Sequence, residues 1–126
     1  KWTIRQVIGH IIDGERVFGF RAFCIARGEQ ASLPGFDEQA YMKESNYDER
    51  SLADLVNDFA QVRAVNLTLL KSLPEEAWKR RGIANGTPVT VRALAYMLAG
   101  HVRHHMGVLA DRYGLPAVTA GRDKTP

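Results

Sequence analysis

The sequence predicts an all-α protein that folds as one helical bundle. The chain has 126 residues, enough for a single domain that buries a core without disulfides or structural metals. Three long segments carry apolar residues at helical spacing, and no segment alternates for long enough to predict a sheet. Its 45% hydrophobic and 25% charged residues are typical of globular proteins.

The first long helix is expected from about Thr3 to Ala26. Its apolar positions recur every three or four residues: Ile4, Val7, Ile8, Ile11, Ile12, Phe18, Ala22 and Ile25. It also carries Gly9, Gly14 and Gly19, each of which destabilises a helix by up to about 1 kcal/mol relative to alanine. Close packing explains Gly9 and Gly19. Gly14 lies one turn beyond His10, where packing and room for a ligand are equally good explanations.

Residues 27–50 lose the helical pattern. Pro34-Gly35 predicts a turn, and a short helix is expected from Asp37 to Lys43 with Asp37 as its cap. This connection is long for a small domain, and such connections often serve as lids or binding loops.

A second long helix is expected from about Ser51 to Leu73, where Pro74 ends it. A short turn anchored by Trp78 follows, and residues 82–88 are expected to form a loop around the Asn85-Gly86 turn. The apolar stripe of the helix consists of Leu52, Leu55, Val56, Phe59, Val62, Leu69, Leu70 and Leu73.

The third long helix is expected from about Thr90 to Tyr113, with Thr87 or Thr90 as its cap and Gly114 at its end. Its inner stripe reads Val91, Leu94, Met97, Leu98, His101, His105, Val108 and Leu109. These helices predict one domain over residues 1–116, and residues 117–126 are expected to form a mobile tail.

Composition excludes several classes of protein. Cys24 is the single cysteine, so no internal disulfide can form and a reducing cytoplasm is the default location. No run approaches the roughly 18 apolar residues of a membrane span. The net charge of +3 comes from 17 basic residues interspersed with 14 acidic ones. A nucleic-acid binder usually has a denser basic stripe, so the cluster at residues 79–81 is weak support for that function.

Histidines carry the strongest chemical signal. Three of the four fall within five residues, and His101 and His105 lie four apart on one helix face, within the apolar stripe. An unpaired buried polar group costs about 1–3 kcal/mol, and a shared metal ion would satisfy both imidazoles. His10 lies on the inner stripe of the first helix and would complete a three-histidine site if the two helices are neighbours. An ordinary pair of core or surface histidines is equally compatible with the spacing.

Other residues around this site allow more than one role. His104 can replace His105 as the partner of His101, or it can lie at the mouth of the site. Asp13 can accept a hydrogen bond from an imidazole N–H, or it can pair with Arg16 or Arg21. A zinc peptidase of the H-E-x-x-H type is disfavoured, because Val102 stands where the glutamate base would be.

Two segments resemble motifs of DinB-like proteins. Residues 2–13, WTIRQVIGHIID, resemble the W-S-x-x-E-x-x-x-H-x-x-D opening of the second helix in that family. Residues 99–107, AGHVRHHMG, resemble its H-x-x-H-H-x-G motif on the last helix. Residues 36–38 and 73–78 resemble the connecting segments of that family. Together, these matches extend over nearly the whole chain, to about Leu115.

The resemblance implies a DinB/YfiT-type four-helix bundle with an up-down-down-up path and one long crossover. Because Lys1 matches the start of the second helix, we expect the first helix to be missing and an apolar groove to be exposed in its place. The resemblance also implies a metal site formed by His10, His101 and His105, whereas His104 matches a family histidine that is usually not a ligand.

The implied function is that of a cytoplasmic, divalent-metal-dependent enzyme acting on a small molecule. Known relatives include S-transferases that use bacillithiol, mycothiol or glutathione; others are described as metal-dependent hydrolases or damage-inducible proteins, and many are homodimers. The metal, Zn, Ni, Fe or Mn, would hold the thiol as thiolate. Arg103, Arg21 or Arg63 can bind a carboxylate of the thiol or substrate, or each can simply be a surface charge.

Two alternatives to a thiol transferase remain: a hydrolase using the same site, and a non-catalytic protein that binds metal or a small ligand. Val102 and Val108 depart from the family pattern, which often has Glu and Gln or Asn there. Both departures are compatible with a different substrate or with metal binding without efficient catalysis.

Overall fold

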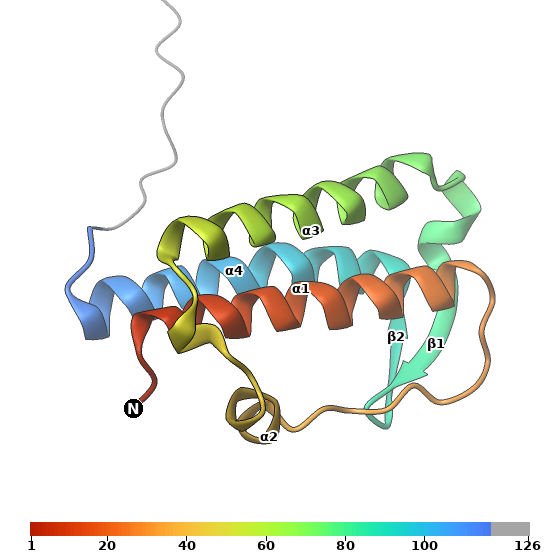
Figure 1. The fold of residues 1–126 in the computed structure, drawn as a ribbon. Coiled ribbons are helices and arrows are strands. Elements are labelled where there is room, and N and C mark those ends of the chain that lie inside the picture. The colour runs from red at the N-terminus through yellow and green to blue at the C-terminus, as the bar shows by residue number, and fades with distance from the viewer. Residues whose placement is uncertain (117–126) are drawn as a thin grey trace, which may run out of the picture.

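A computed structural model describes residues 1–116 as a bundle of three long helices with a short fourth one. The long helices are α1 (Ile4–Ala26), α3 (Leu52–Ser72) and α4 (Val91–Tyr113). Both α3 and α4 pack mainly against α1, which is therefore the central helix (Figure 1). The predicted helical class is confirmed; the expected tail, residues 117–126, lies outside the described residues.

Local side-chain caps explain where the helices begin. Thr3 forms a reciprocal capping box with Gln6 at the start of α1, and the Ser51 and Thr90 hydroxyls accept backbone N–H groups at the starts of α3 and α4. Gly114, at φ 68°, ends α4. Between residues 1 and 116, no helix is long and apolar enough to cross a membrane.

The crossover from α1 to α3 contains the predicted short helix. This helix, α2 (Glu38–Lys43), is capped by the Asp37 carboxylate, which accepts the N–H groups of Gln39 and Ala40. In Figure 1 the crossover and α2 lie on the opposite side of the α1–α4 pair from α3. Two 3-10 turns follow later in the chain, Tyr47–Glu49 and Glu75–Lys79.

The expected loop over residues 82–88 is wrong, because the segment forms a hairpin of β1 (Arg81–Ala84) and β2 (Thr87–Thr90). Asn85 and Gly86 connect the strands with φ values of 52° and 73°, and a two-residue turn with two positive φ angles suits the twist of a hairpin. Each strand has four residues, too few for alternation to stand out in the sequence. Leu33 of the crossover bonds to the hairpin through the Ile83 carbonyl and the Asn85 N–H.

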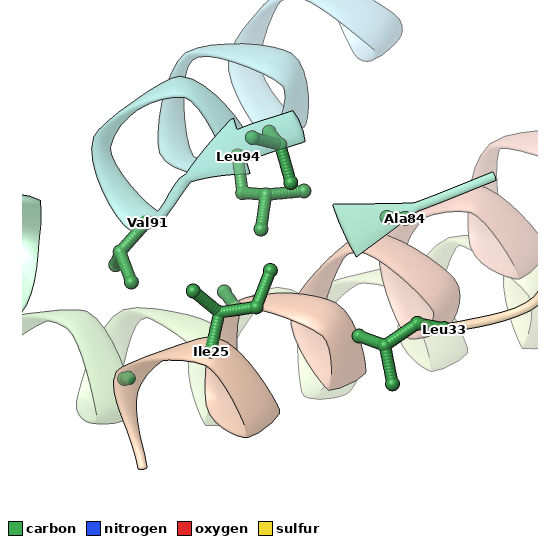
Figure 2. Close-up of a cluster of buried hydrophobic side chains, with 8 residues drawn as sticks. Ile25, Leu33, Ala84, Val91 and Leu94 are labelled. Atoms are coloured by element: carbon green, nitrogen blue, oxygen red, sulfur yellow. The ribbon is translucent and has the colours of Figure 1, made fainter. Parts of the chain in front are cut away.

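The hairpin closes one end of the hydrophobic core. Figure 2 shows Ile25, Leu33, Ala84, Val91 and Leu94 converging there from α1, the crossover, the hairpin and α4. Ile25 and Val91 are fully buried, and burial of a side chain of this size stabilises the fold by about 1.5–3 kcal/mol. This packing fixes the start of α4 against the end of α1.

Glycines on α1 allow side chains from neighbouring segments to approach its backbone. A Cβ atom at Gly9 would lie 2.1–2.5 Å from ring atoms of Tyr47, and one at Gly19 would lie 2.1 Å from the side-chain oxygen of Asn66. Asn66 is buried and donates to the Glu15 carbonyl at 3.0 Å. Both glycines therefore permit close packing, as the sequence predicts.

We expect Gly9→Ala to destabilise the fold by about 1–3 kcal/mol, because the buried Tyr47 ring leaves no space for a methyl group. Urea denaturation measures the change. The matched control is Gly107→Ala, also inside a helix, where nothing lies within 4 Å of the added methyl group. The Gly107→Ala substitution should stabilise the chain by up to about 1 kcal/mol. An equal loss of stability in both variants would contradict the role given to the close contact between Gly9 and Tyr47.

Candidate metal centre

His10, His101 and His105 come together between α1 and α4. One ring nitrogen from each histidine lies within 4.8 Å of the other two, and the Nε2 atoms of His10 and His101 are 3.1 Å apart. The ring centroids are 4.6–4.9 Å apart. The structure thus brings together the three histidines that the sequence pattern singled out.

Gly14 makes this convergence possible. A Cβ atom at Gly14 would lie 2.4 Å from Cε1 of His101 and 2.7 Å from its Nδ1. The space beside this glycine is therefore filled by an imidazole from α4. Trp2 and Phe18 contact the cluster on either side, with ring centroids 5.1 Å from His10 and 5.3 Å from His101.

Burial keeps the three imidazoles neutral. Loss of solvent lowers the pKa of His10, although the charges of Glu38 and Asp13 oppose the shift. Burial, with the neighbouring histidines, lowers the pKa values of His101 and His105 to about 4. Neutral imidazole is the form that binds metal, so all three rings are ready to bind an ion at pH 7.

The nitrogen positions fit a shared divalent ion. Two ligands at about 2.0–2.1 Å from a tetrahedral zinc ion lie about 3.3 Å from each other. The 3.1 Å between the His10 and His101 nitrogens is close to this value, and the His105 nitrogen lies within the same small cluster. Three imidazoles leave a further coordination position open, as in catalytic zinc sites.

A cavity of about 740 Å³ opens beside the cluster. His104 and His105 line it together with apolar and aromatic, polar, acidic and basic side chains: Trp2, Val7, Val108 and Tyr113; Gln39; Glu38; and Lys1 and Arg112. Cavities of this size hold small molecules. His104 is exposed at this opening, with its ring 4.9 Å from that of His105.

Comparison with known proteins gives a family. The model of the DinB superfamily matches residues 1–109. The chain belongs to the DinB superfamily. Among curated proteins, none matches the sequence.

One solved structure shares the bundle of this DinB-superfamily chain. YfiT from Bacillus subtilis, described as a probable metal-dependent hydrolase with an unusual four-helix bundle topology, superimposes with a TM-score of 0.67. The match covers 91% of this chain and 69% of YfiT at 18% sequence identity. The likeness confirms the four-helix-bundle fold class that the family resemblance implies.

In this DinB-superfamily site, Asp13 contacts a residue that the sequence did not suggest. Its carboxylate accepts a hydrogen bond of 2.5 Å from the Tyr47 hydroxyl, not from Arg16 or Arg21. Burial and this hydrogen bond both raise the pKa of Tyr47. The contact ties the crossover to α1 one turn beyond His10, and the Asp13 charge acts on His10.

Two of the three arginines suggested as carboxylate binders have structural partners. Arg21 is buried and donates to the Pro34 carbonyl at 2.9 Å. Arg63 pairs with the buried Glu15 and donates to the Leu98 carbonyl at 3.1 Å. Arg103 is exposed on α4.

Sequence reasoning did not identify Glu38 as part of the site, although it lines the same cavity as His105. Its position depends on how the crossover folds back over α1, and the sequence signal was limited to the Asp37 cap. Cys24 is not an activated thiol, because burial, with the Glu29 charge, raises its pKa.

We expect the metal-free chain to lose stability as the pH falls from about 6.5 to about 4. Folded His101 and His105 stay unprotonated down to about pH 4, whereas in the unfolded chain they bind protons near pH 6.5. The unfolded state therefore holds more protons in this range, and the free energy of unfolding decreases with decreasing pH. Urea denaturation with a chelator at pH 7, 6 and 5 measures the slope.

The variant His105→Gln should show a smaller slope than the wild type. His104→Gln is the matched control at an exposed neighbouring position; its charge is the smallest of the causes that lower the two pKa values, so this variant should keep most of the wild-type slope. Equal slopes in all three proteins would contradict the role given to the buried imidazoles.

Proposed function

We propose that this chain is a divalent-metal-dependent enzyme of the thiol-dependent S-transferase type. His10, His101 and His105 would hold the ion, and their convergence beside an open cavity is the observation that carries the proposal. Zn, Ni, Fe and Mn are the candidate ions. A bound divalent ion would lower the pKa of a thiol or water and keep it as a nucleophile at neutral pH.

The chain's own residues suit the binding of a small molecule with an anionic part. Trp2, Val7 and Val108 give the cavity an apolar wall next to His105. Lys1 and Arg112 lie at the same cavity, and Arg groups bind carboxylates well. Low-molecular-weight thiols such as glutathione carry carboxylates, which supports a thiol as cofactor.

Hydrolysis at the same site is the second candidate. Glu38 lines the cavity and offers a carboxylate that can accept a proton from an attacking water. The relative YfiT is described as a probable metal-dependent hydrolase, which supports this alternative. Both reactions need the same three histidines.

A cytoplasmic location and a homodimer complete the proposal. A lone cysteine suits a reducing compartment, and the dimer follows from the family resemblance. Light scattering tests the dimer, and a mass of one chain would contradict it.

The first test is metal content. We expect close to one zinc, nickel, iron or manganese ion per chain after reconstitution without chelator, measured by elemental analysis. His101→Ala should abolish stoichiometric binding, because it removes a ligand from α4, whereas His104→Ala should keep it. Less than about 0.2 ion per wild-type chain would overturn the proposal.

Gly14→Ala should weaken metal binding by about 10- to 100-fold, since the added methyl group displaces the His101 ring. Competition with a coloured chelator measures the affinity. Gly19→Ala is the control, because its methyl group meets Asn66 of α3 and no histidine. An unchanged affinity in Gly14→Ala would show that His101 is not a ligand.

Activity assays distinguish thiol transfer from hydrolysis. The metal-loaded chain should consume glutathione, bacillithiol or mycothiol with an electrophile such as 1-chloro-2,4-dinitrobenzene at roughly ten times the rate of His101→Ala, or more. Turnover of 4-nitrophenyl acetate without thiol would favour the hydrolase. Inactivity toward thiols, esters and amides would favour a metal-binding protein without catalysis.

A further inference from the structure

A divalent ion at the three-histidine cluster would need negative charge nearby. Three neutral imidazoles contribute no negative charge, so a divalent ion held by them would keep its full charge in a partly buried site. Ions in such sites are stabilised by nearby carboxylates, which bind directly or accept hydrogen bonds from coordinated groups. A carboxylate near the cluster would therefore stabilise a bound ion.

Two carboxylates act on the cluster. Glu38 and Asp13 both raise the pKa of His10, and the effect of Glu38 is the larger. Asp13 already accepts the Tyr47 hydroxyl at 2.5 Å. Within residues 1–116, the Glu38 side chain has neither a hydrogen bond nor an ion pair, and it lines the cavity with His104 and His105.

The crossover holds Glu38 in this place. Glu38 is the first residue of α2, directly after the Asp37 cap. At the other end of α2, Met42 is buried against Ile12 and Tyr47. Leu33 anchors the preceding chain to the hairpin, so α2 is fixed against the bundle from both directions.

We infer that the Glu38 carboxylate, which lines the cavity with His105, supplies negative charge to an ion held by the three histidines, through water in the cavity and not as part of the histidine cluster itself. This inference rests on the proposed metal site. It assigns the crossover a part in metal binding, in addition to its packing role. It also gives a carboxylate from outside the two histidine motifs an effect on the ion.

The test compares Glu38→Gln with wild-type protein, using Zn²⁺ and Co²⁺ as probes and a coloured chelator as competitor. Glutamine keeps the size of the side chain and removes its charge, so we expect binding about 10- to 100-fold weaker. Glu44→Gln is the matched control on the same short segment; Glu44 is exposed and borders a different cavity, which Asp13 and Tyr47 also line. That variant should bind within about twofold of the wild type.

A second measurement follows the crossover itself. Metal binding should slow amide hydrogen exchange over residues 38–43 in the wild type, because the ion draws Glu38 toward the histidines. In Glu38→Gln the same addition should leave this exchange unchanged, while residues next to His101 are still protected. Glu38→Asp should recover part of the lost affinity, because it restores the charge.

The outcomes distinguish the inference from the proposed function. Wild-type protein that binds neither Zn²⁺ nor Co²⁺ would overturn the three-histidine site and the inference with it. Wild-type binding that Glu38→Gln retains in full would overturn the inference alone. Equal losses in Glu38→Gln and Glu44→Gln would also overturn it, because a general charge effect would then account for both.

Discussion

The structure depends on side chains from neighbouring segments lying very close to the backbone of the central helix, α1. Gly9, Gly14 and Gly19 are five residues apart, and each step of five turns the helix by about 140°. The three glycines therefore face three different sides of α1. Each side receives one side chain from a different neighbour: Tyr47 from the crossover, His101 from α4 and Asn66 from α3. A single helix thus positions the crossover, α3 and α4.

The groups that approach α1 are polar, so each contact also fixes the position of a neighbouring segment along the axis of α1. Tyr47 donates to Asp13, Asn66 donates to the Glu15 carbonyl, and His101 meets His10. Arg63 joins Glu15 of α1 to the Leu98 carbonyl of α4, one turn before His101. A slip of one helix along another would leave these buried groups unpaired, at about 1–3 kcal/mol each. The histidines are consequently held by the same interactions that hold the bundle.

The sequence predicted the helices and the histidine positions, which depend on local residue patterns. It did not predict the hairpin or the position of Glu38 in the crossover. The three long helices followed from their apolar periodicity, with Thr90 as one of two cap candidates for α4. The pair His101 and His105 stood out on an apolar stripe, and the set of three histidines followed from the family resemblance. The hairpin was missed because four-residue strands carry almost no periodic signal. Glu38 was missed for another reason: its role comes from a crossover that returns across α1, and spacing along the chain does not encode that return.

The two anchors of the crossover have a further consequence for how such a protein can diversify. Leu33 is bonded to the hairpin and Tyr47 is packed on Gly9, so the stretch between them, which lines the cavity through Glu38 and Gln39, is held at both ends. Gln39 of this stretch lines the cavity, whereas the three histidines lie on α1 and α4, so a change at Gln39 would alter the cavity wall while the histidines keep their places. The crossover can therefore reshape the cavity separately from the two helices that carry the histidines.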